Sequence, residues 1–180
     1  DTKRFLSLEL DEVGAINYNV TPLNSDAKIT YTPYIDAGIT NEDTNWDDQF
    51  WDVLEVSRNN KQSYIEARTM KTHFHTCAFM ESRLFINDEA VITDSNNEQT
   101  SNYTSCSYLQ EIKQNETYTI HKFGGYVVDR NHDKNELVAA AKATLDKAVD
   151  FGFEYPGAPP PVLKKPLLPI VRLFSFCFCV

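Results

Sequence analysis

Residues 50–70 read FWDVLEVSRNNKQSYIEARTM, and this stretch determines the class of fold that the sequence predicts. Two runs rich in β-branched and aromatic residues, 50–56 and 64–70, flank the polar segment 57–63, which is the pattern of a β-hairpin. The same succession of apolar run and polar turn continues in both directions along the chain. Further strands are expected at 5–10, 16–20, 29–35, 74–86, 103–112 and 117–128.

The first of these runs shows the alternation most clearly. Leu6, Leu8 and Leu10 fall on one face of an extended chain, and Ser7 and Glu9 fall on the other, as in a half-buried strand. At least seven strands of this kind are most simply buried by stacking antiparallel sheets. The sequence therefore predicts a mainly β protein built as a β-sandwich.

The periodicity changes after residue 132. Asp133, followed three residues later by Glu136, resembles a capping box, and Gly152 is a suitable residue to end a helix. These signals predict one helix over 134–151, which follows the strands and so belongs to the end of the domain or to a connection. The apolar positions at helical spacing are Leu137, Ala141, Leu145, Ala148 and Val149.

Composition narrows the classes of function. The chain has 180 residues, enough for one domain, and a net charge of −9, so its surface repels phosphate backbones and anionic lipids. We expect no nucleic acid and no membrane as partners; the apolar run 167–180 is shorter than the roughly 20 residues of a membrane span. Four cysteines make no disulfide framework and no signal peptide is visible, which favours the cytoplasm.

The last segment differs from the rest. No acidic residue follows Glu154, and six of the eight prolines lie beyond it. We therefore divide the chain into a β domain at 1–130, a helical connection at 131–153 and an atypical tail at 154–180. The tail is interpreted either as the product of a frameshift or assembly error or as a natural disordered segment.

An acidic loop with tryptophans is the first candidate site. Asp43-x-Asn45-x-Asp47 imitates the start of a calcium-binding loop, but Asp48 stands where the turn glycine belongs and Leu54 where the bidentate glutamate belongs. A structural interpretation, an acidic surface loop anchored by buried aromatic residues, is preferred to a calcium site or to catalysis.

The same loop could also contact other molecules. Trp46 and Trp51 could stack on a sugar ring, which would suit a standalone carbohydrate-binding β-sandwich. Two tryptophans beside several acids also suit an anchored contact with another domain or with a dimer partner. The candidate contact loop comprises Asn45, Trp46, Asp47, Asp48 and Trp51.

A zinc site is the second candidate. On a strand, the period of two would place His73, His75 and Cys77 on one face, with His121 or Cys106 supplying a further ligand from a neighbouring strand. Side chains two apart on one strand surround an ion poorly, so an ordinary mixed sheet face is preferred and no metal is assigned. Gly124-Gly125 matches no phosphate-binding loop and indicates a bulge or a close backbone approach.

Several ordered segments together resemble glycoside hydrolase family 65, in particular its bacterial disaccharide phosphorylases of the maltose and kojibiose type. They begin with the TPLN of 21–24 and the PYIDAGITNEDTNWDDQFW of 33–51. The likeness covers about residues 3–153. The remaining segments are ARTMKT at 67–72, FGGYVVDRNH at 123–132 and NELVAAAK at 135–142.

The resemblance implies that this region is the later part of an N-terminal antiparallel super-β-sandwich, followed by one α-helix of the linker to an (α/α)6 barrel. It implies a homodimeric parent enzyme that cleaves an α-linked glucose disaccharide with inorganic phosphate as co-substrate, with inversion. The acid and the phosphate-binding residues of the family lie in the barrel, so no catalytic residue, cofactor site or metal ligand is carried over to this chain. Relative to the family, the chain is expected to be truncated at both ends and to aggregate when expressed alone.

Overall fold

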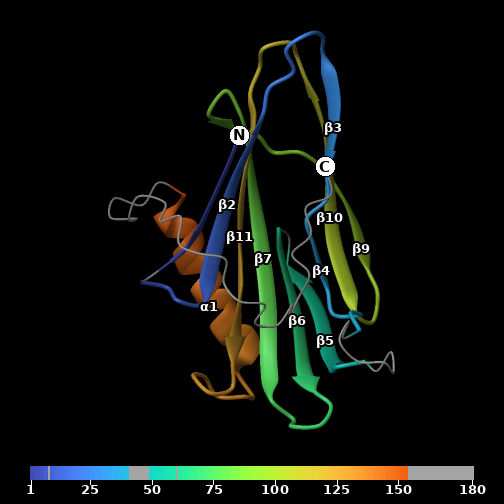
Figure 1. The fold of residues 1–180 in the computed structure, drawn as a ribbon, viewed down its shortest axis with the longest axis vertical. Coiled ribbons are helices and arrows are strands. Elements are labelled where there is room, and N and C mark those ends of the chain that lie inside the picture. The colour runs from blue at the N-terminus through green and yellow to red at the C-terminus, as the bar shows by residue number, and fades with distance from the viewer. Residues whose placement is uncertain (8, 41–48, 60, 154–180) are drawn as a thin grey trace.

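The computed structural model describes residues 1–7, 9–40, 49–59 and 61–153. These residues form two antiparallel sheets and one helix, as the sequence predicts (Figure 1). The elements are β1 (Thr2–Leu6), β2 (Val13–Val20), β3 (Ala27–Tyr31), β4 (Tyr34–Asp36), β5 (Trp51–Asn59), β6 (Gln62–Thr69), β7 (His75–Ile86), β8 (Glu89–Ala90), β9 (Ser95–Gln99), β10 (Tyr103–Ile112), β11 (Tyr118–Val128) and α1 (Leu137–Phe151).

The larger sheet has the order β1-β2-β11-β7-β6-β5, and β8 adds to β7. Near the middle of this sheet, β2 pairs with β11, although the two strands are distant in sequence. In the smaller sheet β10 is central. Thr104 and Ser105 pair with both β4 and β9, so these strands lie on opposite edges of β10, and β3 continues the edge of β4.

The two faces of the large sheet are covered by different layers. Helix α1 packs on one face, across β7, β11, β6 and β2, and the small sheet covers the other (Figure 1). Successive residues of β7 therefore enter different cores: Phe79 packs with Phe123 beneath the helix, and Met80 packs with Ile35 of the small sheet. Burial on both faces explains why β7 is buried without interruption from Thr76 to Ser82.

Helix α1 buries the five positions predicted from its periodicity, Leu137, Ala141, Leu145, Ala148 and Val149. Gly152, at φ 72°, ends it as predicted. The predicted start at 134 and the capping box are wrong. The Asp133 carboxylate accepts hydrogen bonds from the backbone N (2.9 Å) and side-chain Nδ2 (3.1 Å) of Asn135, and Glu136 makes no side-chain capping bond, so the helix begins at Leu137.

The first predicted strand, 5–10, is also wrong in extent. The Ser7 hydroxyl accepts hydrogen bonds from the backbone N of Leu10 (2.9 Å) and Glu9 (3.3 Å), which forms a turn in place of the ladder. The strand therefore ends at Leu6, whose side chain is exposed. Phe5 faces the core instead, with its ring centroid 5.1 Å from that of Phe153.

Other boundaries shift for identifiable reasons. The predicted turn 57–63 is shorter, because Ser57, Arg58 and Asn59 pair with residues of β6. The predicted strand 29–35 breaks before Tyr34 at Pro33, which has no backbone N–H to donate. Neither β8 nor β9 was predicted, since SNNEQ at 95–99 carries no apolar alternation and pairs only along the edge of β10.

Gly125 marks a close backbone approach, as predicted. A Cβ at this position would lie 1.9 Å from the carbonyl oxygen of Glu12, and that oxygen accepts a hydrogen bond from the backbone N of Tyr126 (3.2 Å). The register of β11 with β2 and β7 is continuous through Gly124 and Gly125, so the alternative of a bulge is wrong. The carboxylate of Glu12 also contacts Nε2 of His132 at 2.8 Å, which ties the turn before β2 to the segment before α1.

Candidate interdomain surface

The predicted contact loop leaves and rejoins the fold at an isolated bridge between Thr40 and Gln49. Of its five predicted residues, Asn45, Trp46, Asp47 and Asp48 lie outside the described residues, as does the calcium-like motif from Asp43 to Asp47. Trp51 is described and is only 4% exposed. A buried indole offers no open face to a sugar ring, so the platform expected of Trp51 is wrong, whereas its predicted burial is confirmed.

Phe50, the residue before Trp51, lies on the protein surface. Its ring meets the Trp51 ring edge to face, with centroids 5.1 Å apart and planes at 79°. Consecutive residues of an extended chain point to opposite sides, so burying Trp51 leaves Phe50 43% exposed. The backbone oxygen of Phe50 accepts a hydrogen bond from the N of Met70 (3.2 Å), which brings the 54% exposed Met70 to the same place.

A bulge in β5 adds a third exposed apolar side chain. Val53 pairs with Ala67 and Glu55 pairs with Glu66, so Leu54 is an extra residue without a partner in β6. Val53 and Val56 both pack on the core between the two sheets, while Leu54 between them is 42% exposed. We call Phe50, Leu54 and Met70 together the β5 corner.

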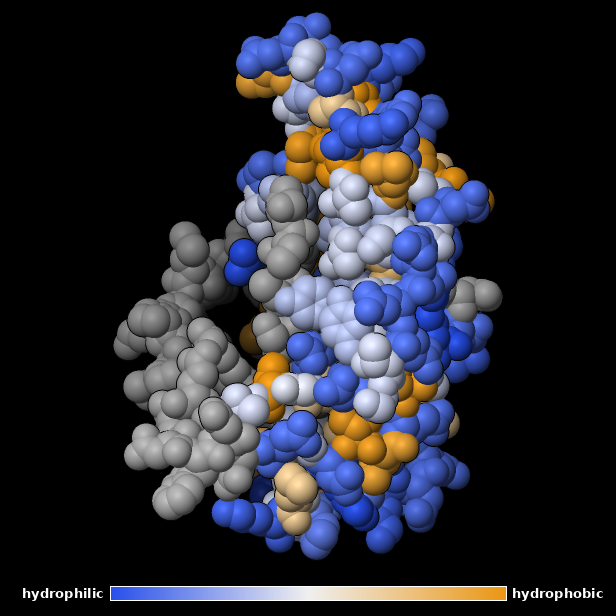
Figure 2. Space-filling view, turned by 90° about the vertical axis from the view of Figure 1, so that its right-hand side faces the viewer, coloured by the Kyte–Doolittle hydropathy of each residue, from blue (hydrophilic) through white to orange (hydrophobic). Residues whose placement is uncertain are grey.

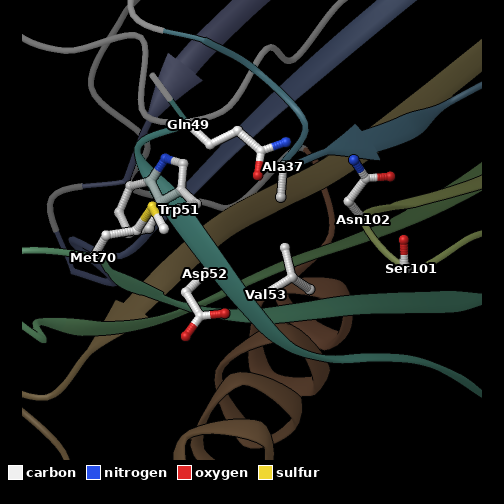
Figure 3. A pocket seen from close by; sticks show the side chains of 8 residues that line it. All are labelled: Ala37, Gln49, Trp51, Asp52, Val53, Met70, Ser101 and Asn102. Carbon is white, nitrogen blue, oxygen red and sulfur yellow. The ribbon is translucent and has the colours of Figure 1, made fainter. Parts of the chain in front are cut away.

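A hollow of about 230 Å³ adjoins this corner (Figure 3). Figure 3 shows Gln49, Trp51 and Met70 on one side of it and Ser101 and Asn102 on the other. Half of its lining side chains are polar, so it can accept both apolar and hydrogen-bonding groups. The lining residues are Ala37, Gln49, Trp51, Asp52, Val53, Met70, Ser101 and Asn102.

Hydrogen bonds fix the far wall of the hollow. The backbone N of Ala37 donates to the carbonyl oxygen of Asn102 (2.9 Å), and the N of Gly38 donates to the Asp36 carboxylate (2.8 Å). On the near wall, Nη2 and Nε of Arg68 lie 2.6 Å and 2.8 Å from Oδ2 of Asp52. Because both charged groups are about two-fifths exposed, this ion pair orients side chains more than it stabilises the fold.

The zinc hypothesis fails on geometry. His73 lies in the turn before β7, at φ 52°, so the strand period does not align it with His75 and Cys77. Cys77 is buried beneath α1, where burial raises the pKa of its thiol, and Cys106 lies in the core on the other side of the sheet. His121 stacks on Phe153. Within the described ranges, no three histidine, cysteine, aspartate or glutamate side chains gather to hold a metal ion.

Sequence reasoning selected Trp51 at this surface and missed Phe50, Met70 and Leu54. The sequence did contain a signal for an exposed aromatic side chain, because Phe50 and Trp51 are adjacent. Adjacent residues of a strand point to opposite faces, so one of the two is exposed at a sheet edge unless both faces are covered. Figure 2 shows that apolar side chains gather toward both ends of the face it displays, with more hydrophilic surface between. In the part of the chain that the structure describes, no helix is long and apolar enough to cross a bilayer.

Comparisons with known proteins agree with this architecture. Residues 1–155 match the family described as "Glycosyl hydrolase family 65, N-terminal domain". The maltose phosphorylase of Bacillus subtilis (strain 168) is 29% identical over 153 residues, which are 85% of this chain and 20% of that protein. The α,α-trehalose phosphorylase of Thermoanaerobacter brockii is 27% identical over 165 residues, which are 84% of this chain and 20% of that protein.

A solved structure assigned as a kojibiose phosphorylase from the human microbiome shares the fold, with a TM-score of 0.68 and 17% identity. The superposition covers 83% of this chain and 19% of that one. The chain thus spans about a fifth of the length of the relatives it matches.

Proposed function

Because the chain belongs to glycosyl hydrolase family 65, we propose that it is the non-catalytic N-terminal part of a longer disaccharide phosphorylase. The match of residues 1–155 to the N-terminal domain of that family supports this proposal. About four-fifths of each similar relative lies outside the matched region, which leaves room for a separate catalytic domain, the (α/α)6 barrel that the resemblance implies. This chain then contributes structure and assembly, and no residue of it contacts the reacting atoms.

The proposed reaction of the parent protein is phosphorolysis of an α-linked glucose disaccharide, with maltose as the first substrate to test. An oxygen of inorganic phosphate attacks the anomeric carbon from the face opposite the glycosidic bond, and the bond from that carbon to the bridging oxygen breaks. A carboxylic acid protonates the bridging oxygen as it leaves. The products are β-glucose 1-phosphate and glucose, and the configuration at the anomeric carbon is inverted.

The organisation of the parent follows from the same proposal. Residues 1–130 form the supporting sandwich, and 131–153 connect it to the barrel, with α1 packed back on the sheet. The tail at 154–180 is excluded from the functional domain. We place the parent in the cytoplasm as a homodimer; the free, buried thiols of Cys77 and Cys106, which lie in separate cores, suit a reducing compartment.

A domain exchange tests the proposal. Residues 1–153 replace the matched fifth of the Bacillus subtilis maltose phosphorylase, and phosphate-dependent release of β-glucose 1-phosphate is measured with maltose, trehalose and kojibiose. The expected result is activity in the chimera and none in the 180-residue chain. The control is the same relative without the matched fifth, which should be inactive. A folded but inactive chimera, or turnover by the 180-residue chain alone, would contradict the proposal.

A further inference from the structure

Strand β5 is covered unequally by the rest of the domain. It is the last strand of the large sheet, and β6 is the one strand with which it pairs along its length in the described residues. One side of it faces the core between the two sheets, because Trp51 is buried and the partly buried Val53 and Val56 pack on that core. Helix α1 packs on the sheet farther in, across β7, β11, β6 and β2.

Leu54 is the one apolar side chain among the three exposed residues of β5, and a polar residue there would serve the fold equally well; the other two are Glu55 and Asn59. Leu54 occupies the extra position of a bulge, and bulges at sheet edges re-aim side chains. A leucine there contributes nothing to either core and leaves apolar surface in water. Phe50 and Met70 are also exposed and are joined by a backbone hydrogen bond, and Met70 lines the hollow, whose lining includes amide, hydroxyl and carboxylate groups. An apolar centre beside a polar rim is the composition of a protein–protein contact.

We infer that the β5 corner, with the hollow beside it, is the surface on which the remaining polypeptide of the parent phosphorylase packs against this domain. The inference rests on the proposed function, since it requires a parent with a further domain. The relatives place about four-fifths of their length outside the matched region. A domain joined through the same chain is present at high effective concentration, so it occupies such a surface before a second copy can.

The two methionines of the sequence provide the test without mutation. Met70 is 54% exposed and Met80 is 1% exposed, so peroxide should convert Met70 to its sulfoxide and spare Met80 in the 180-residue chain. In the chimera described above, oxidation of Met70 should be at least ten times slower. Peptide mass spectrometry measures the two rates separately, and protection of Met80 confirms in each sample that the domain is folded.

A matched control distinguishes local protection from a general effect. Ile92→Met places a methionine at a position that is 91% exposed, and it should oxidise equally fast in both proteins. Equal rates for Met70 in the chain and in an active chimera would overturn the inference while leaving the proposed function intact. Protection of Met70 in the active chimera that grows with concentration would assign the corner to a second copy and also overturn it.

Two further outcomes remain decisive. Protection of Met70 in a chimera that lacks activity would support the docking surface and contradict the proposed function. If the chimera oxidises Met80 and is therefore unfolded, the measurement moves to the intact Bacillus subtilis enzyme, with a methionine placed at the position aligned with Met70. Slow oxidation there supports the inference, and oxidation as fast as that of the 91% exposed control overturns it.

Discussion

Two buried tyrosines between the sheets differ in one hydrogen bond. The hydroxyl of Tyr31 lies 3.2 Å from that of Ser82, whereas the hydroxyl of Tyr118 has no hydrogen-bond partner among the described residues. A buried hydroxyl without a partner costs about 1–3 kcal/mol. We therefore expect Tyr118→Phe to leave the free energy of unfolding unchanged or to raise it by roughly 1 kcal/mol, and Tyr31→Phe to lower it by about 0.5–1.5 kcal/mol. Urea unfolding at pH 7 measures both variants.

The same tyrosine predicts a loss of stability in alkali. Burial raises the pKa of Tyr118 from 10.0 to about 12. As the pH rises above 10, the unfolded chain loses this proton before the folded chain does, so stability present below pH 10 is lost progressively up to about pH 12. One such group contributes about 1.4 kcal/mol per pH unit in that window. Unfolding curves of Tyr118→Phe between pH 9.5 and about 11.5 should fall less steeply than those of the wild type; parallel curves would contradict the prediction.

Gly125 and Gly14 form a second comparison, because both lie where β2 and β11 pair. An alanine at Gly125 would press its Cβ against the backbone of Glu12, which cannot move without breaking the turn. At Gly14 the nearest atom is 3.1 Å away at the end of the exposed Leu6 side chain, which can rotate aside. We expect Gly125→Ala to lower the melting temperature by an amount equivalent to roughly 1–3 kcal/mol or more and Gly14→Ala to have a smaller effect. Equal losses would show that both sites are limited by backbone contact.

At the scale of the element, α1 is held by its apolar face. Leu145 is fully buried against the large sheet, so Leu145→Ala should destabilise the domain by about 2–5 kcal/mol through lost burial and the cavity left behind. Lys142, on the exposed side of the same helix, is the matched control, and Lys142→Ala should change stability by less than about 0.5 kcal/mol. Calorimetry of the two variants compares them; similar melting temperatures would mean that the helix is not coupled to the sheet.

Elements with strong periodicity were predictable from sequence. Strand β10 has the predicted bounds, 103–112, and the five buried positions of α1 match the predicted ones. The ends of β1 and α1 were not predictable, because Ser7 and Asp133 each bond to nearby backbone groups in a way that competes with the regular ladder or cap. The periodicity of apolar residues shows which side chains share a face of an element. It does not show whether a side chain near the end of that element will bond to the backbone and end it early.

The candidate surface was predicted only in part, because the exposure of its residues depends on contacts that the local sequence does not show. The sequence marked the region of Trp51 as unusual, and the structure buries that residue. Which of two adjacent aromatic residues faces inward depends on what covers each side of β5, and that is decided by the small sheet, whose strands come from elsewhere in the chain. The exposure of Leu54 depends on a bulge that no residue of the strand signals.

At the scale of the whole molecule, the edge strand β5, which pairs with β6 alone among the described strands, should govern self-association of the isolated chain. An exposed edge strand with apolar side chains is a site for pairing with other copies, and a lysine on it prevents such pairing. Leu54→Lys should therefore reduce light scattering at high protein concentration. Leu109→Lys removes a leucine that is 54% exposed, compared with 42% for Leu54, from β10, which is the central strand of the small sheet, and it should have less effect. If both variants reduce light scattering equally, exposed apolar surface in general, and not the sheet edge, would be responsible for the self-association.

The pairing of β2 with β11 determines the order in which this domain can be completed during synthesis. Strands β5, β6 and β7 are neighbours both in sequence and in the sheet, so they can pair as soon as they leave the ribosome. The β1–β2 hairpin must wait for β11, about 100 residues later, which at roughly 5–20 residues per second is on the order of 5–20 s. A nascent chain that ends before Tyr118 therefore presents β2 as an open edge to chaperones, whereas one that extends past Val128 has closed it.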